Sequence, residues 1–353
     1  MRSRPRRSQI RIPTPRQIFE HLDRYVIGQD RAKRTVAIAA HNHLKRCHTR
    51  REGATLLRKS NVLMIGPTGC GKTHIARNLA EFLELPFVVV DATEYTEAGY
   101  YGKDVEVMVA ELLFSASHNI EETERGIIFV DEVDKLARRS HGARTGAGSR
   151  DIGGEGVQQG LLKLLEGRDI FVPLNVTQHW NKHDFVQVNT QDILFICAGT
   201  FSDLEMYSAT TRSIGFSGDG EPGRTRHVST KDLLDYGMVQ EFLGRLPVVV
   251  CLDALGADEL LKILTLPPDS LLREYKELLA LDDVDLHVTQ GALKEIVEFS
   301  VARRAGARGL RGIMEEVCHD LLFEAPELRR RRVVIDLPTV REKLKALEGA
   351  ELV

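Results

Sequence analysis

Glycines, a lysine and a threonine in the segment 66–73 have the residue types and spacing to hold phosphate groups. The segment fits the pattern G-x-x-x-x-G-K-[ST] at every fixed position and reads Gly66-Pro67-Thr68-Gly69-Cys70-Gly71-Lys72-Thr73. In such a loop, backbone N–H groups surround phosphate oxygens, Lys72 neutralises the β- and γ-phosphates, and the Thr73 hydroxyl binds Mg²⁺. A structural glycine turn is the alternative. An apolar run before the segment and a helical pattern after it, from His74 to Leu83, favour the phosphate site.

Two neighbouring carboxylates supply the second part of this chemistry. Asp131 and Glu132 directly follow the apolar run 126–130, about 60 residues after the glycine-rich loop. Strand ends are where α/β sheets place ligands. We therefore predict that Asp131 holds Mg²⁺ with Thr73, and that Glu132 is the general base for an attacking water.

Arg245 is the candidate for the positive charge that a phosphoryl-transfer transition state requires. It lies in Gly244-Arg245-Leu246-Pro247 near the end of the segment that carries the phosphate motif. An arginine supplied by a neighbouring subunit can raise such a rate by about 10³ to 10⁵. A surface arginine in an ordinary ion pair is an equal alternative on spacing alone.

The elements that must position these residues read as strands alternating with helices. Short continuous apolar runs indicate strands covered on both faces, and intervening helical stretches indicate a mainly parallel sheet. Residues 17–50 read as helices interrupted by an apolar turn, Val26-Ile27-Gly28-Gln29. The sequence thus predicts an α/β fold, with strands at residues 61–65, 86–90, 126–130 and 193–197.

A change of pattern near residue 250 divides the chain. We predict a basic tail at 1–12, a large domain at 13–250, and a small, mostly helical domain at 251–348 with one late strand at 332–335. The tail is interpreted as solvated, with a targeting signal or a nucleic-acid arm as lesser alternatives.

Composition narrows the functional classes. The 353 residues carry a net charge of −3, which argues against a bulk nucleic-acid binder, and they contain no apolar run long enough for a membrane span. The five cysteines form no Cys-x-x-Cys pair, so we expect no zinc and a cytoplasmic location with reduced thiols. His41, His43, Cys47 and His48 could suggest a metal site, but a solvated helix face is the preferred interpretation.

These motifs together resemble the ClpX family, the ATP-binding unfoldase subunits of the Clp protease within the AAA+ ATPases. The resemblance runs from about residue 13 to 336. Besides the two phosphate-site motifs it rests on residues 24–29, 97–102, 240–247 and 306–311, and on Arg150-Asp151 with 154–159, which resembles the family's second pore loop. It implies an AAA+ P-loop large domain followed by a small α/β lid domain, a homohexameric ring, and ATP with Mg²⁺ as ligands.

The resemblance also assigns roles to single residues. It implies that Val26 and Ile27 contact the adenine, that His74 at the start of the following helix also lies at the nucleotide, and that Arg308 reaches the nucleotide of its own subunit. Arg245 would reach a neighbour's nucleotide. Thr200 is a weaker candidate for the polar sensor after the fourth strand.

Two loops would serve partners. By resemblance, Tyr100 and Tyr101 belong to a pore loop that pushes substrate polypeptide through the ring. The tripeptide Ile214-Gly215-Phe216 resembles the one that docks on a ClpP-type peptidase; a partly tucked loop is its alternative. No membrane partner is expected, and nucleic acid is unlikely as a partner.

The sequence departs from the family in two places. The usual zinc-binding domain before residue 13 is missing, which suggests either a natural short form or a truncated chain. At the expected pore entrance stands Gln178-His179-Trp180 instead of a basic run, which predicts a different preference for substrate tags. Alternative functions are a remodeller that acts without a peptidase, a nucleotide-gated scaffold and, with little support from the charge balance, a DNA-acting motor.

Overall fold

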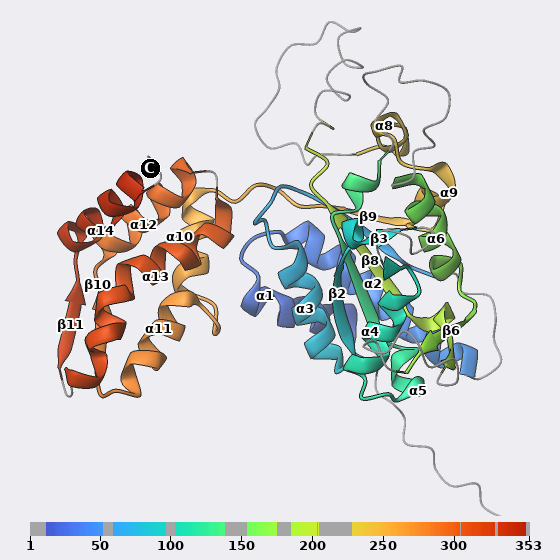
Figure 1. Cartoon of the computed structure of the whole chain (residues 1–353), viewed down its shortest axis with the longest axis horizontal. Helices are drawn as coiled ribbons and strands as arrows, with labels where there is room; N and C mark the ends of the chain where they lie inside the picture. The colour runs from blue at the N-terminus through green and yellow to red at the C-terminus, as the bar shows by residue number, and fades with distance from the viewer. Residues whose placement is uncertain are drawn as a thin grey trace, which may run out of the picture.

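The structure, a computed structural model, describes residues 12–51, 59–96, 103–137, 154–174, 185–202, 204, 228–303, 305–328 and 331–350. Figure 1 shows a larger part built around a twisted sheet and a smaller, mostly helical part, joined by an extended segment after the last strand of the sheet.

The larger part contains a five-stranded sheet in which all neighbours are parallel. The strand order is β2-β5-β8-β1-β9. The strands are β1 (Val62–Ile65), β2 (Phe87–Asp91), β5 (Ile127–Asp131), β8 (Leu194–Gly199) and β9 (Val248–Cys251). The four strands predicted from apolar runs and the parallel sheet are confirmed, whereas β9 was missed.

Helices cover both faces of this sheet. Alternate residues of β5 point to opposite sides, so that Ile127 and Phe129 join one apolar cluster while Ile128 and Val130 join the other. The first cluster packs against α1 (Pro15–Tyr25), α2 (Asp30–Arg51) and α3 (Lys72–Leu83). The second packs against α4 (Val107–Ser115), α6 (Gly154–Glu166) and α9 (Gln240–Gly244). Two short helices, α5 (Ile120–Thr123) and α8 (Thr230–Tyr236), complete the helices described in this part.

Local signals in the sequence set the first helices. The α1 helix begins with a capping box between Thr14 and Gln17 and with Pro15 at its first position. It ends at Tyr25, and the turn that follows contains two residues with positive φ, Gly28 at 65° and Gln29 at 57°. The predicted helix–turn–helix over residues 17–50 is confirmed.

Short strands and single turns surround the sheet. A two-residue parallel bridge joins β3 (Tyr95–Thr96) to β4 (Lys103–Asp104), and an antiparallel pair joins β6 (Asp169–Pro173) to β7 (Phe185–Asn189). Three 3₁₀ turns follow strand ends: η1 (Ala92–Glu94), η2 (Val133–Leu136) and η3 (Thr190–Asp192). None of these was predicted, because each has five residues or fewer, which is too short for a hydrophobic period to be recognised.

The smaller part has its own apolar core, which includes Leu264, Leu286, Ile296, Met314 and Val340. Its helices are α10 (Ala257–Thr265), α11 (Leu271–Ala280), α12 (Gln290–Ala302), α13 (Gly306–Glu324) and α14 (Leu337–Ala350), with the turn η4 (Ala325–Glu327) after α13. Its two strands, β10 (Asp285–Val288) and β11 (Arg332–Ile335), pair in parallel. The late strand predicted at 332–335 is confirmed, and β10 was missed.

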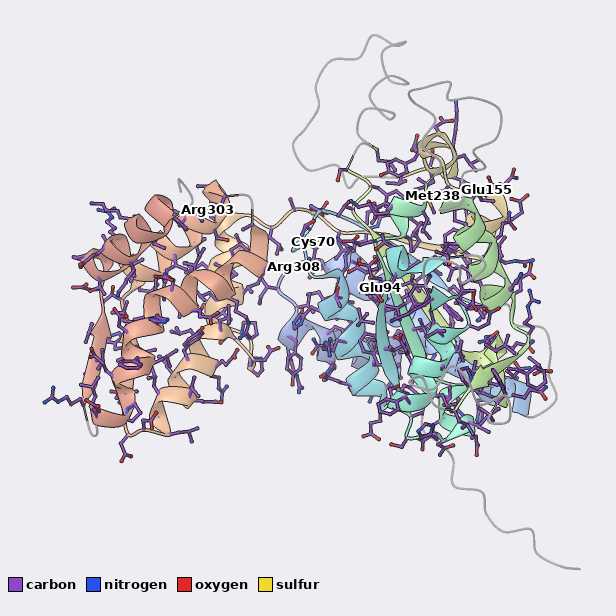
Figure 2. The ribbon with its side chains drawn as sticks, viewed as in Figure 1. Cys70, Glu94, Glu155, Met238, Arg303 and Arg308 are labelled. Atoms are coloured by element: carbon purple, nitrogen blue, oxygen red, sulfur yellow. The ribbon has the colours of Figure 1, made fainter. Side chains whose placement is uncertain are left out.

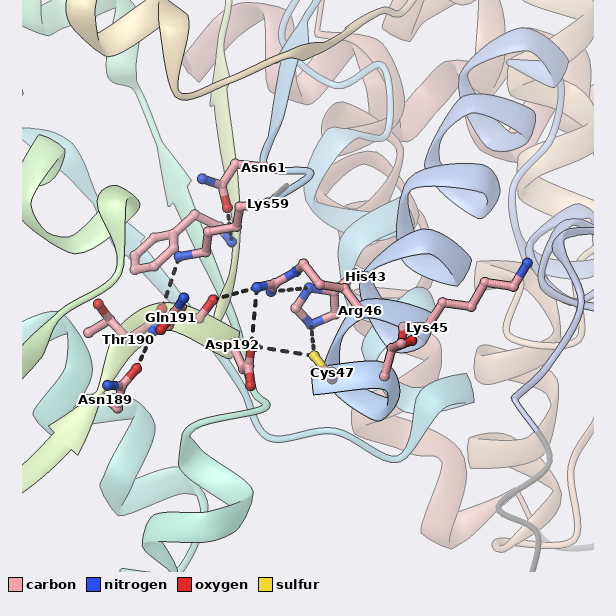
Figure 3. Close-up of polar contacts among 12 residues, drawn as sticks. His43, Lys45, Arg46, Cys47, Lys59, Asn61, Asn189, Thr190, Gln191 and Asp192 are labelled. Carbon is pink, nitrogen blue, oxygen red and sulfur yellow. Dashed lines mark hydrogen bonds and ion pairs between the residues drawn. The ribbon is translucent and has the colours of Figure 1, made fainter. Parts of the chain in front are cut away.

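The interpretation of the histidine-rich face of α2 as solvated was wrong. His43, Arg46 and Cys47 are buried, with 1%, 5% and 8% of their surface exposed. Arg46 Nη1 donates to the Gln191 carbonyl at 2.9 Å and pairs with the Asp192 carboxylate at 3.0 Å, as Figure 3 shows. This face packs against the η3 turn that precedes β8, so the Nη1 atom of Arg46 finds its partners within the protein instead of in water.

Two features are absent from the residues that the structure describes. No helix among them is long and apolar enough to cross a lipid bilayer. Within the same residues, no group of three or more histidine, cysteine or acidic side chains gathers at a metal-binding spacing.

Candidate functional site

The glycine-rich loop connects β1 to α3 and lies tightly against two neighbouring strands. The Gly66 N–H donates to the Gly199 carbonyl of β8 at 3.2 Å. A Cβ at Gly66 would lie 2.8 Å from the carbonyl oxygen of Leu252, just after β9, so no side chain fits there. Gly69 and Gly71 have φ values of 75° and 100°, which glycine adopts without strain. The loop thus needs its glycines both for close packing and for its backbone path.

Lys72 is held inside the loop. Its side chain is buried, and Nζ donates to the carbonyl oxygens of Gly66 at 2.7 Å and Pro67 at 3.0 Å. Both acceptors are neutral, so the positive charge is available to an anion at the loop. Thr73 is half-buried at the start of α3, where the helix N-terminus adds favourable dipole for an anion. Thr68, by contrast, is exposed.

The two predicted carboxylates lie where β5 ends. Asp131 is half-buried and Glu132 is exposed. The Glu132 N–H donates to Asp131 Oδ1 at 2.9 Å, and Glu132 has a positive φ of 57°, which ends the strand abruptly. Only β8 separates β5 from β1 in the sheet. Because parallel strands end at a common edge, the carboxylates and the glycine-rich loop occupy the same edge of the sheet.

Between them lies a buried contact that the sequence did not reveal. Asp134, in the η2 turn after Glu132, is 6% exposed. Its Oδ2 accepts hydrogen bonds from the Thr200 hydroxyl at 2.9 Å and the Phe201 N–H at 3.3 Å. Thr200, predicted as a polar sensor, therefore contacts the turn that carries the carboxylates. The Asp-Glu-x-Asp spacing was the available signal for Asp134.

The turn after α1 reaches the loop from the other side. Val26 is buried and Ile27 is half-buried. Gln29, the last residue of the segment 24–29, donates from Nε2 to the carbonyls of Asp253 at 2.8 Å and Cys70 at 3.5 Å, and its Oε1 accepts from the Asp253 N–H at 3.0 Å. One amide thus joins the turn, the glycine-rich loop and the segment leading to the smaller part.

The smaller part also contacts the loop directly, through the start of α13. A Cβ at Gly69 would lie 3.2 Å from the Ala307 N atom, and one at Gly306 would lie 3.3 Å from the Thr68 carbonyl oxygen. Arg308 follows on the first turn of α13 and is exposed. Figure 2 shows Arg308 and Cys70 near each other at the junction of the two parts.

His74 bridges the same junction on the α3 side. Its Nε2 lies 3.3 Å from the Tyr25 carbonyl oxygen and 4.0 Å from the Asp269 carboxylate of the smaller part. The structure therefore brings together the predicted residues of the loop, the turn after α1, the β5 carboxylates and the start of α13.

Comparison with known proteins now identifies the family. The AAA domain (Cdc48 subfamily) matches residues 57–249, and the C-terminal, D2-small domain of ClpB protein matches residues 255–332. A protein of Wolinella succinogenes named ATP-dependent Clp protease ATP-binding subunit ClpX 2 is 44% identical over 315 residues, which cover 89% of this chain and 78% of the relative. Proteins named ATP-dependent Clp protease ATP-binding subunit ClpX from Borrelia duttonii and Treponema denticola are 42% and 40% identical over 334 and 335 residues. Each match covers 92% of this chain, and 77% and 80% of the respective relatives.

This chain belongs to the ClpX family. The predicted family and α/β fold class are confirmed, and the chain is an AAA+ ATPase. The roles of single residues within this ClpX-family site stay predictions.

Arg245 lies apart from the other predicted site residues of this ClpX-family chain. It caps the C-terminus of α9, and its Nη2 is 2.7 Å from Glu166 Oε1 at the end of α6. Both side chains are about half exposed, at 51% and 48%. Within a single chain Arg245 is thus in a surface ion pair, which was one of its two predicted states. Such a pair contributes only about 0.2–1 kcal/mol, so another anion can displace Glu166.

Several predicted segments of this ClpX-family chain fall outside the described residues. They are the pore-loop residues Tyr100 and Tyr101, the docking tripeptide Ile214-Gly215-Phe216, the pore-entrance residues Gln178-His179-Trp180, and Arg150-Asp151. The described part of the predicted second pore loop, from Gly154 onward, is helix and not loop: it forms the first turns of α6. Val157 and Gln158 of that helix are buried.

Proposed function

We propose that this chain is an ATP-driven protein unfoldase that assembles into a hexameric ring and feeds unfolded substrates to a ClpP-type peptidase. The observation that carries the proposal is the Lys72 ammonium, held by neutral carbonyls in a glycine-rich loop at the sheet edge where Asp131 and Glu132 end β5. The names of the ClpX relatives support the link to a Clp protease.

The loop residues would bind the triphosphate. Lys72 would exchange its carbonyl partners for β- and γ-phosphate oxygens, and backbone N–H groups of the loop would surround the phosphates. Thr73 and Asp131 fit Mg²⁺, because a hydroxyl and a carboxylate are hard oxygen ligands at the same edge. When bound, that ion would neutralise charge developing on the phosphates. Val26, Ile27 and His74 would line the nucleotide's base side.

Glu132 would orient and deprotonate the attacking water. Its carboxylate is exposed at the strand end, and its backbone is held by the hydrogen bond to Asp131. Asp134 fixes the η2 turn just beyond it through Thr200 and Phe201. A base that keeps one position between turnovers needs little reorganisation to reach the transition state.

Two arginines would complete the site from elsewhere. Arg308, at the start of α13, would sense the nucleotide within its own chain and move the smaller part when that nucleotide is cleaved. Arg245 would leave Glu166 and stabilise transition-state charge in the adjacent subunit. The hinge of this motion would lie near residues 252–255, where the proposed large domain, 13–250, leads into the proposed small domain, 251–348.

The remaining functions in the proposal depend on segments outside the described residues. Tyr100, beside Tyr101, would grip substrate through apolar area in the axial channel. The tripeptide 214–216 would dock on the peptidase. We place the protein in the cytoplasm because its five cysteines form no Cys-x-x-Cys pair and are expected to be reduced thiols.

A coupled assay tests the proposal. We expect Mg²⁺-dependent ATP hydrolysis by the intact chain, and ATP-dependent loss of fluorescence from a folded fluorescent protein that carries a disordered C-terminal tail. Glu132→Gln should bind ATP while turnover falls at least about 100-fold, and Lys72→Ala should lose binding. Tyr100→Ala should hydrolyse ATP but not unfold the reporter. Hydrolysis without unfolding by the wild-type chain, at any tail sequence tried, would contradict the unfoldase assignment.

A further inference from the structure

A cluster of charged side chains surrounds the two ends of the segment 97–102. That segment leaves β3 and returns in β4, and the two strands pair so that Tyr95 faces Lys103 and Thr96 faces Asp104. A parallel pair normally needs a connection of a dozen or more residues. Here only six lie between the strands, so contacts beyond the two-residue bridge have to hold the ends together.

Lys103 supplies the polar part of those contacts. Its Nζ donates to Glu94 Oε2 at 3.0 Å and to Glu111 Oε1 at 3.0 Å. The ammonium also lies 5.7 Å from the centre of the Tyr95 ring. The hydrogen bonds to Glu111 and Glu94 raise the pKa of Lys103 above its usual value, so the side chain stays charged at neutral pH. One lysine on β4 therefore holds both the residue before β3 and a residue of α4.

Each carboxylate connects Lys103 to a different part of the ATPase core. Glu94 ends the η1 turn, which contacts the η2 turn beyond Glu132; Figure 2 marks Glu94 within the larger part, away from the junction. Glu111 lies on α4, whose residues Met108 and Leu112 are fully buried in the core beside β5. The Tyr95 hydroxyl donates to Glu111 at 3.5 Å.

The charged cluster around Lys103 is too exposed to contribute much to the stability of the fold. Lys103 and Glu94 are about half exposed, at 45% and 54%. Ion pairs of this kind contribute little to global stability and weaken with salt. The apolar residues of α4 and the buried Tyr95 hold the surrounding structure without it. Its effect is therefore local, on the two ends of segment 97–102.

We propose that Lys103 is a positioning residue for the predicted pore loop. Its ammonium group anchors both ends of that loop to α4 and to the η1–η2 turns beside the carboxylates. Any force on the segment between β3 and β4 acts on the ends of these two strands, and Lys103 keeps the strands from separating under it. The assignment rests on the proposed unfoldase function. It deepens that function by naming the charge that holds the two ends of the loop while a stable substrate is unfolded.

The test compares Lys103→Met with Lys103→Arg and with Lys294→Met, which removes an exposed lysine of α12. Three rates are measured for each chain: ATP hydrolysis, unfolding of the folded fluorescent reporter, and degradation of the same reporter after chemical unfolding, with a ClpP-type peptidase present. For Lys103→Met we expect slower unfolding of the folded reporter by about fivefold, with the other two rates within about twofold of wild type. Lys103→Arg should restore unfolding, and Lys294→Met should match wild type.

Salt provides a readout that a purely structural role would not affect. Because screening weakens exposed ion pairs, wild-type unfolding per ATP should fall as salt rises, while that of Lys103→Met should stay flat. Normal unfolding by Lys103→Met, or equal losses of hydrolysis and unfolding, would overturn the assignment. If instead wild type fails to unfold the reporter, or Tyr100→Ala unfolds it normally, the proposed function fails and not merely the role of Lys103.

Discussion

The side-chain amide of Gln29 pairs with the backbone of Asp253 through two hydrogen bonds, 2.8 Å from Nε2 to the carbonyl oxygen and 3.0 Å from the Asp253 N–H to Oε1. Asp253 lies in the segment that joins the larger part to the smaller one. The same Nε2 also reaches the Cys70 carbonyl of the glycine-rich loop. Gln29 therefore connects the glycine-rich loop to the segment that leads into the smaller part.

We predict that Gln29→Ala weakens ATP binding about tenfold, because the hydrogen bonds of its amide to Asp253 and to the Cys70 carbonyl, worth about 0.5–1.5 kcal/mol each, are lost. Gln29→Glu keeps the acceptor for the Asp253 N–H but sets its second carboxylate oxygen against the Asp253 carbonyl oxygen, so its loss should be at least as large. Titration with a fluorescent ATP analogue measures both dissociation constants. Equal affinity for wild type and Gln29→Ala would show that this junction does not contribute to the nucleotide site.

The buried carboxylate of Asp134 gives a second prediction. Asp134→Ala leaves the Thr200 hydroxyl and the Phe201 N–H without this acceptor. An unsatisfied buried group costs about 1–3 kcal/mol, so we expect unfolding in urea at clearly lower concentration. Thr200→Val removes one bond and should cost about 1 kcal/mol. Since the two residues share that bond, the double variant should be less destabilised than the sum of the single ones; strict additivity would contradict the contact.

The burial of His43 predicts acid sensitivity. Burial, followed by the nearby charges of Arg46 and Lys59, lowers the pKa of His43 to about 3. Between its ordinary pKa and that value the unfolded chain binds a proton that the folded chain does not, so stability falls as pH falls. At about 1.4 kcal/mol per pH unit, the loss from pH 6.5 to pH 4.5 is about 2–3 kcal/mol.

Urea unfolding at several pH values measures this effect. His43→Leu should flatten the dependence between pH 6.5 and 4.5 relative to wild type, whereas His319→Leu, which changes an exposed histidine, should not. Protonation of carboxylates is common to all three chains and cancels in the comparison. An unchanged slope in His43→Leu would mean that His43 is protonated in the folded state.

Sequence reasoning succeeded where one local pattern determines a structure. The apolar run of β5 and the motif around Lys72 each contain their own signal, and the structure brings them to one sheet edge. By contrast, β9 was missed because this edge strand has only four residues and is partly exposed. The buried face of α2 was misjudged because His43 and Arg46 are polar by type. Burial is favourable because Arg46 has partners in the η3 turn and His43 contacts Arg46 and Cys47 of its own helix.

The contacts that tie the site together were not predictable from local patterns. Gln29 and Asp253 are 224 residues apart in the sequence, and Asp134 and Thr200 are 66 apart. Each depends on a tertiary approach that leaves no periodic trace. The ion pair of Arg245 with Glu166 likewise depends on the packing of α6 and α9 on the same face of the sheet.

The central claim, that Glu132 of one subunit and Arg245 of the next act on the same ATP, is tested most directly by mixing two inactive chains. Glu132→Gln and Arg245→Ala should each hydrolyse ATP at least about 100-fold more slowly than wild type. In an equal mixture, about a quarter of the head-to-tail interfaces pair an intact Glu132 with an intact Arg245 from its neighbour, so activity should recover towards about a quarter of wild type. A mixture that forms rings but stays as inactive as its components would contradict the account.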